Sequence, residues 1–140
     1  MLDDSPVSSQ PLIHKNPEII ESTNQAIIYI SESLKLNSSL KEINLSYNNI
    51  GDEGIKHLSE SLKINSSLNE IYLRNNSIGD QGAIIILDLL SSNHSLTKFC
   101  LDGNFVDNSL TLQINSIIEQ NQKLIEPIFV PNVRKKFRVV

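Results

Sequence analysis

A 28-residue repeat constrains the fold of this 140-residue chain more than any other feature of its sequence. Segments that begin at Ser39, Ser67 and Ser95 align without gaps, and the spacing of their first leucines gives the period, 68 − 40 = 96 − 68 = 28. The same residue types recur at five places: Leu40, Leu68 and Leu96; Ile43, Ile71 and Phe99; Leu45, Leu73 and Leu101; Asn48, Asn76 and Asn104; Ile50, Ile78 and Val106. A unit of this length buries its apolar face only by stacking on its neighbours, so the repeat predicts a solenoid.

Each repeat changes its hydrophobic period partway. In KEINLSY the apolar Ile43 and Leu45 alternate with polar residues, which is typical of a half-buried strand. After Gly51 the apolar residues follow helical spacing, at Ile55, Leu58 and Leu62. The pattern therefore predicts a strand, a turn, a helix and a second turn in every repeat.

The turn residues suggest how each helix starts and stops. Asp52 is a plausible N-cap, and Asn65 suits a left-handed turn after the helix. Gly54 and Gly82 are expected to allow close packing, because the sequence holds no glycine-rich phosphate-binding motif.

Both ends of the chain continue the repeat in weaker form. AIIYISESLKLNS from Ala26 matches GIKHLSESLKINS from Gly54, whereas Pro11 and Pro17 interrupt the strand expected around Leu12 to Ile20. Downstream, Leu124, Pro127, Phe129 and Asn132 fall in phase. We divide the chain into a tail or degenerate cap (1–17), a repeat domain (18–132) and a basic C-terminal tail (133–140). The repeat domain comprises a helical half-repeat (18–38), repeats 39–66, 67–94 and 95–122, and a capping strand (123–132).

The pattern LxxLxLxxNxIGDEGxxxLSESL resembles the ribonuclease-inhibitor type of leucine-rich repeat, over about Ala26 to Asn132. That family includes the ribonuclease inhibitor, the sensor region of NOD-like receptors and the Ran GTPase-activating protein. The resemblance implies an α/β leucine-rich-repeat solenoid, a short right-handed arc with parallel strands on the concave side and helices on the convex side. Its members mostly bind proteins. In the third repeat Asp107 and Leu110 replace the two glycines of the pattern.

One asparagine follows each strand where the chain turns inward. A side-chain amide there can donate to and accept from backbone groups that the turn leaves unpaired. We therefore interpret Asn48, Asn76, Asn104 and Asn132 as a buried structural ladder rather than a binding site.

The strand residues that point away from the core should line the concave side, which we call the strand face. Candidate partner-binding residues there are Glu42, Asn44, Tyr47, Glu70, Tyr72, Arg74, Lys98, Cys100 and Asp102. Tyr72 and Arg74 are the strongest candidates, because tyrosine and arginine are favoured anchors of protein interfaces. The alternative is that they are ordinary solvated strand residues.

The helix of the second repeat offers another candidate surface. Lys56, His57, Ser59 and Ser61 of the first repeat are replaced there by Ile84, Ile85, Leu87 and Leu89. A helix that is apolar nearly all round must pack against something. The convex face could therefore bind a partner or form a weak homodimer, unless flanking helices cover it.

Composition and motifs favour binding over catalysis. No metal-ligand cluster, nucleophile with a base, or paired carboxylate is apparent, so we expect no enzyme activity, cofactor or metal. The net charge of −4 gives no attraction to nucleic acid or membranes, and we expect a protein partner. An alternative, by analogy with the Ran GTPase-activating protein, is that Arg74 regulates a bound nucleotide hydrolase. A single cysteine and the lack of an export signal suggest a cytoplasmic location.

Overall fold

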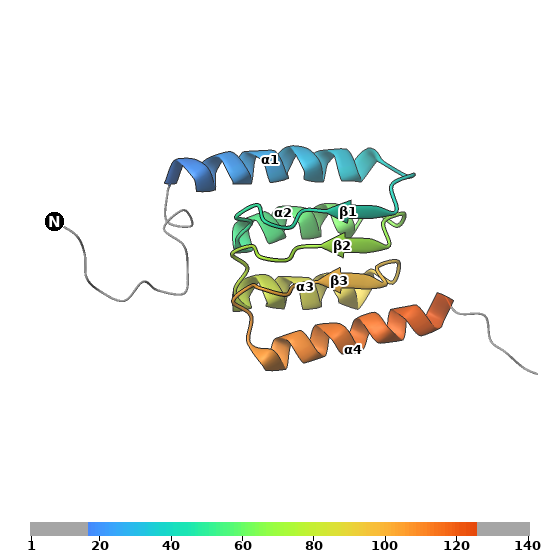
Figure 1. Ribbon diagram of the computed structural model, residues 1–140. Coiled ribbons are helices and arrows are strands. Elements are labelled where there is room, and N and C mark those ends of the chain that lie inside the picture. The colour runs from blue at the N-terminus through green and yellow to red at the C-terminus, as the bar shows by residue number, and fades with distance from the viewer. Residues whose placement is uncertain (1–16, 126–140) are drawn as a thin grey trace, which may run out of the picture.

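A computed structural model describes residues 17–125 as an alternation of helices and short strands (Figure 1). The strands form one layer and the helices lie behind and beside it, with longer helices at the two ends of the stack. In chain order the elements are α1 (Pro17–Leu36), β1 (Glu42–Asn44), α2 (Asp52–Leu62), β2 (Glu70–Tyr72), α3 (Asp80–Ser92), β3 (Lys98–Cys100) and α4 (Asn108–Ile125).

The three strands form a parallel sheet in the order β1-β2-β3. Ile43 pairs with Ile71, and Ile71 pairs with Phe99, so the pairing register equals the repeat period. Equivalent side chains therefore lie side by side across the sheet. This arrangement confirms the predicted α/β solenoid with one strand and one helix in each repeat.

The hydrophobic core lies between the strand layer and the helix layer, and its side chains are most completely buried in the second repeat. Leu68, Ile71 and Leu73 are completely buried there. Leu40, at the N-terminal end of the stack, is 37% exposed, because no earlier repeat covers it in the described structure. Each buried leucine or isoleucine contributes about 1.5–3 kcal/mol before the cost of ordering the chain, so the stacking of repeats provides most of the stability.

The predicted asparagine ladder is present, and Asn76 is its most buried member. Its side-chain oxygen accepts hydrogen bonds from the backbone N–H groups of Asn48 and Ile50, and its amide donates to the carbonyls of Leu45 and Leu73. One side chain thus joins the turns of two adjacent repeats. Asn104 repeats part of the pattern and is half-buried, whereas Asn48 is exposed at the edge of the stack. Asn132 lies outside the described residues.

A second asparagine ladder runs along the opposite ends of the strands. Asn93 is buried, donates to the carbonyl of Leu62 and accepts from the N–H groups of Ser95 and Leu96. Asn65 makes the same contacts one repeat earlier, and it does not have the left-handed conformation that we predicted. The sequence signal for this ladder is the regular recurrence of Asn-x-Ser-Leu, at 37–40, 65–68 and 93–96.

The prediction that Asp52 caps its own helix was wrong. Gly51 is the N-cap residue, and no side chain caps that helix. The carboxylate of Asp52 instead accepts a hydrogen bond of 2.7 Å from the backbone N–H of Gly79, in the next repeat. Gly82 packs where we expected, since a β-carbon there would lie 2.6 Å from an oxygen of Asp52.

The two ends of the repeat domain compare differently with the prediction. Helix α1 begins at Pro17, which fits the helical half-repeat predicted at 18–38 and not the degraded strand expected around Leu12 to Ile20. Helix α4 begins in phase despite the altered glycine positions, but it continues to Ile125. The first part of the predicted capping strand, residues 123–125, is therefore helical in this structure, and residues 126–132 lie outside the described range.

Replacing Asn76 by alanine should lower the free energy of unfolding by about 3 kcal/mol, because buried N–H and carbonyl groups on two repeats would lose their partner. Urea denaturation followed by circular dichroism measures the change. Asn115→Ala on the exposed side of α4 is the control and should change the value by less than about 0.5 kcal/mol. Equal effects of the two substitutions would contradict a stabilising role for the ladder.

Candidate functional site on the strand face

The sheet register brings the predicted strand-face residues together in two rows. Glu42, Glu70 and Lys98 form one row, and Asn44, Tyr72 and Cys100 form the next. Glu70, Tyr72 and Cys100 are half-buried, while Glu42, Asn44 and Lys98 are exposed. The strand face is thus a continuous surface of polar and aromatic side chains over β1, β2 and β3.

Tyr72 lies at the centre of this surface and is held by its neighbours. Its hydroxyl donates a hydrogen bond of 2.7 Å to a carboxylate oxygen of Glu70. The Lys98 ammonium lies 5.1 Å from the centre of the ring and the Arg74 guanidinium 6.0 Å from it, within the range of cation–π attraction. Because these contacts fix the ring in advance, a partner would bind it with little loss of side-chain entropy.

The same contacts alter the acidity of the cluster. The hydrogen bond to Glu70 raises the pKa of Tyr72 above its ordinary value of 10.0, because the phenolate form cannot donate to a carboxylate. The hydrogen bond with Tyr72 also raises the pKa of Lys98. Tyr72 therefore remains a neutral hydrogen-bond donor, and Lys98 remains charged, throughout the physiological range.

Arg74 is less constrained than Tyr72. Its Nε lies 3.6 Å from a carboxylate oxygen of Asp102, and their side chains are 49% and 83% exposed. An exposed pair at this distance stabilises the fold by at most about 1 kcal/mol. Arg74 can therefore exchange Asp102 for a carboxylate or carbonyl of a partner.

Tyr47 lies at the edge of the strand face in an unusual backbone conformation. Its φ angle is 62°, and the equivalent residues Asn75 and Gly103 have φ angles of 51° and 76°. The repeat thus requires a left-handed residue here, which suits glycine and asparagine but is costly for a bulky residue. The Tyr47 side chain is 77% exposed, so burial does not offset that cost.

The convex candidates on α3 are only partly accessible. Ile84 is 49% exposed, and Ile85 and Leu87 are half-buried against the core. Leu89 is completely buried, so its prediction as a convex contact residue was wrong. The apolar character of α3 mostly reflects its central place between α2 and α4. What remains for a partner is a small patch centred on Ile84.

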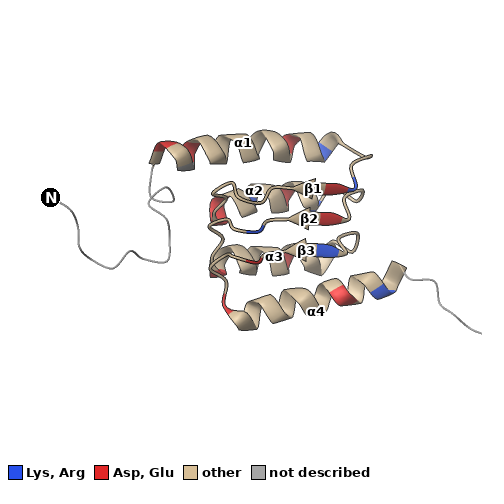
Figure 2. Ribbon diagram, viewed as in Figure 1, with Lys and Arg blue, Asp and Glu red and all other residues tan. Residues whose placement is uncertain are grey.

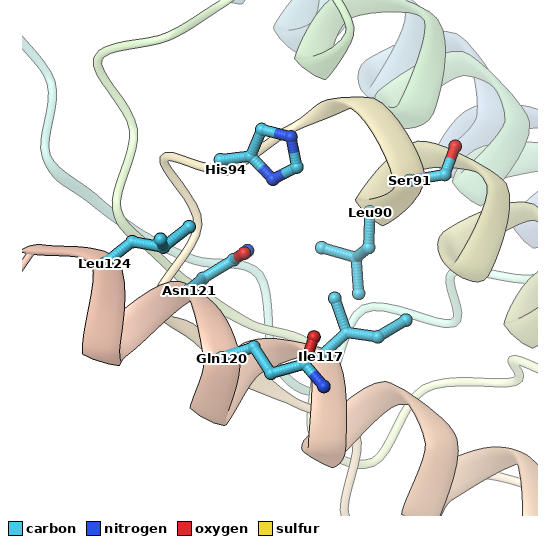
Figure 3. A pocket seen from close by; sticks show the side chains of 7 residues that line it. All are labelled: Leu90, Ser91, His94, Ile117, Gln120, Asn121 and Leu124. Atoms are coloured by element: carbon cyan, nitrogen blue, oxygen red, sulfur yellow. The ribbon is translucent and has the colours of Figure 1, made fainter.

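A pocket of about 370 Å³ lies between the end of α3 and α4 (Figure 3). Its lining residues are Leu90, Ser91, His94, Ile117, Gln120, Asn121 and Leu124. The Asn121 amide already donates to the carbonyls of Asn93 and Leu96, and His94 is the single titratable side chain in the lining. This combination offers no general acid and base pair and no set of metal ligands.

Two smaller pockets of about 230 Å³ each lie beside α1, and neither is lined by an acidic, basic or histidine side chain. Acidic and basic residues are scattered over both layers (Figure 2). No group of three histidine, cysteine or acidic residues in this part of the chain could hold a metal ion. None of the helices described is long and apolar enough to cross a membrane. The strand face therefore remains the best-defined candidate site.

Replacing Tyr47 by asparagine should raise the free energy of unfolding by about 1 kcal/mol, because asparagine tolerates the left-handed conformation. Thermal and urea denaturation measure the change. Tyr47→Ala is the matched control: it removes the ring but keeps the β-carbon, so it should give no such gain. If alanine stabilises the protein as much as asparagine does, backbone conformation is not the cause.

Replacing Glu70 by glutamine should lower the pKa of Tyr72, because the carboxylate that raises it is removed while Lys98 remains. A pH titration of ¹³C-labelled tyrosine by NMR, assigned with Tyr72→Phe, measures this pKa. Glu42→Gln, in the same row of the strand face, should leave it unchanged. An unchanged titration of Tyr72 in the Glu70 variant would contradict the hydrogen bond.

Comparison with known proteins supports the repeat assignment. The family model described as Leucine Rich repeat matches residues 36–59 and 65–87. A search of curated proteins finds no match.

Similar solved structures include leiomodin-1 actin-binding site 2, with 15% identity, a TM-score of 0.59, and coverage of 82% of this chain and 79% of that one. They also include the C-terminal domain of tropomodulin from Caenorhabditis elegans, with 21% identity, a TM-score of 0.58, and coverage of 71% of this chain. The match spans 59% of the tropomodulin domain. At these identities the likeness establishes the fold alone. The repeat matches, the parallel sheet and the shared fold together support an α/β solenoid of the leucine-rich-repeat type.

Proposed function

We propose that this chain is a non-catalytic protein-interaction module, and that its strand face binds a protein partner around Tyr72 and Arg74. The observation that carries the proposal is the cluster of Tyr72, Glu70 and Lys98 at the centre of the sheet, next to the exposed Arg74. A prearranged tyrosine beside a loosely paired arginine provides contact area and directional hydrogen bonds, which are the usual elements of an interface hot spot.

The surrounding surface suits a partner with mixed charges. Glu42 and Asp102 are exposed acidic residues of the strand face, and the exposed Lys98 and Arg74 are basic. Such a surface selects a partner of complementary pattern rather than a polyanion such as nucleic acid. Tyr47 would add an aromatic contact at the edge, where the fold keeps it exposed.

The finer assignments rest on the sequence. Resemblance to the ribonuclease-inhibitor type of repeat supports protein binding, and a single cysteine, Cys100, which cannot form a disulfide within the chain, favours the cytoplasmic location that we propose. The second candidate function, regulation of a nucleotide hydrolase through Arg74, is favoured by one observation, the exposure of a guanidinium that a weak ion pair holds. The strand face without catalysis is the simpler proposal, because binding needs only the contact area and hydrogen bonds that Tyr72 and Arg74 provide.

The test is affinity capture from a cell lysate with the native chain and with a Tyr72→Ala/Arg74→Ala double variant, followed by mass spectrometry. Purified actin is included as a defined probe, because one similar structure is an actin-binding site. We expect a protein that the native chain retains and the double variant binds at least about tenfold more weakly. Ile84→Ala, on the convex side, is the matched control and should keep the partner.

Two outcomes would count against the proposal. Equal retention by the native chain and by the double variant, with circular dichroism showing both folded, excludes the strand face. Loss of the partner in the Ile84→Ala variant, with binding kept by the double variant, would indicate that the binding site lies on the convex side. If the partner hydrolyses a nucleotide, Arg74→Ala separates the two functions, because a regulator would lose stimulation while keeping most of its affinity.

A further inference from the structure

The second asparagine ladder holds the turn after each of the first three helices in the same way. In each case the side-chain oxygen of the asparagine accepts hydrogen bonds from two consecutive backbone N–H groups, those of a serine and a leucine. The bonds are 2.7–3.0 Å long, and the three sets are Asn37 with Ser39 and Leu40, Asn65 with Ser67 and Leu68, and Asn93 with Ser95 and Leu96. The oxygen at this position is therefore suited to a pair of adjacent N–H groups, the second of which belongs to a leucine.

Asn121 is the next member of this ladder, and its oxygen lacks such a pair. Its amide donates to the carbonyl of Asn93, as the amide of Asn93 donates to the carbonyl of Asn65. The residues after Asn121 continue α4 to Ile125, so their N–H groups are directed along the helix. No hydrogen bond from residues 17–125 reaches the Asn121 oxygen.

This unpaired oxygen lies at a pocket. Asn121 is 2% exposed and lines the cavity of about 370 Å³ between the end of α3 and α4. Figure 3 shows its amide group ending inside the cavity, between His94 and Ile117. In the described part of the chain only Ser31 and Ser77 have a fully enclosed side-chain oxygen without a partner, so the Asn121 oxygen remains accessible. A ligand that donates to it would complete the hydrogen bonding of a nearly buried amide.

The walls of the pocket are apolar, and its other polar side chains are exposed. Leu90 is buried, Ile117 is half-buried and Leu124 is 70% exposed. The side chains of His94 and Gln120 have no hydrogen-bond partner among the residues that the structure describes. The lining contains no acidic side chain, lysine or arginine. Such a pocket suits a neutral ligand with an aliphatic part and N–H donors rather than an ion.

The end of α4 is held in place beside the pocket. The side-chain amide of Gln122 donates to the carbonyl of Thr97 at 2.7 Å. The amide of Asn121 donates to the carbonyls of Asn93 and Leu96, on the turn between α3 and β3. Because these contacts form the pocket in advance, a ligand would bind without ordering the helix.

We propose that this pocket binds a leucine-containing peptide segment of a protein partner. Two consecutive backbone N–H groups of the segment donate to the oxygen of Asn121, as the residues after Asn93 donate to its oxygen one repeat earlier. The leucine side chain packs against the apolar walls, and Gln120 donates to a carbonyl of the segment. The volume is near the lower end of the range for ligand pockets, about 300–1,000 Å³, which suits a short anchor. No strand residue lines this pocket, so the site is separate from the strand face.

A capped dipeptide tests the proposal on the full chain by NMR titration. The probe is N-acetyl-Ser-Leu N-methylamide, which carries the two residues that fill the equivalent position in the earlier repeats. We expect saturable chemical-shift changes at Leu90–His94 and Ile117–Leu124 with a Kd of about 1 mM, the weak affinity expected of so small a ligand. The Tyr72→Ala/Arg74→Ala variant should bind the probe equally, so the result does not depend on the strand-face proposal.

The matched control probe has an ester oxygen in place of the leucine N–H. It keeps both side chains but loses one donor, so it should bind at least about fivefold more weakly. Equal affinities of the two probes would overturn the proposal without any change to the protein. The absence of saturable shifts up to about 10 mM of the amide probe would also overturn it.

Leu124→Ala and Leu112→Ala are the matched protein variants. The two leucines lie on α4 with 70% and 67% exposure, but only Leu124 lines the pocket. We expect Leu124→Ala to weaken binding of the probe about threefold and Leu112→Ala to leave it unchanged. Equal effects would contradict the assigned pocket. So would shifts of the pocket residues that grow with protein concentration in the absence of probe, because a second copy would then be the occupant.

Discussion

Buried side-chain amides hold each repeat to the next. A leucine-rich-repeat strand as short as β1, β2 or β3 makes too few ladder hydrogen bonds to define a sheet alone, and its turns leave further backbone groups without partners. Asn76 and Asn93 satisfy those groups at the two ends of the strands, each from inside the core. An unpaired amide would be costly in the core, so these contacts favour strand pairing with a shift of one repeat. Each strand-face residue therefore lies beside the residue at the same position of the next repeat.

The strand face follows from this register. Glu70 and Tyr72 share one face of β2 because alternate strand residues point the same way, whereas Lys98 of β3 joins them because the two strands pair with a shift of one repeat. The result is a tyrosine held by a carboxylate on its own strand and a cation on the next. A repeat protein thus obtains a defined surface from positions that the fold leaves free to vary, while the leucine and asparagine positions maintain the scaffold.

At the two ends of the stack, side chains have a neighbouring repeat on one side only. Leu40 is partly exposed at the first repeat. At the last, the side-chain amide of Gln122 donates to the carbonyl of Thr97, whose equivalents Lys41 and Asn69 accept backbone N–H groups from the following repeat. Helices α1 and α4 are longer than α2 and α3, which lets them cover the two flanks of the stack that residues 17–125 form. End units are where solenoids depart from their consensus, because one face of each must be compatible with water.

The periodic sequence by itself determined the fold class, the strand and helix of each repeat, the core columns and the first asparagine ladder, because all of these repeat with one period and need only local patterns. It also indicated which side chains point outward. Only the tertiary structure decided what depends on a neighbouring repeat: that Asp52 binds Gly79 rather than its own helix, that Asn65 spans two repeats, and that Leu89 is buried between helices. The contacts of Asp52 and Asn65 join residues about one repeat apart in the chain, and their energies depend on packing that no single segment encodes. The tertiary structure likewise decided that α4 continues to Ile125.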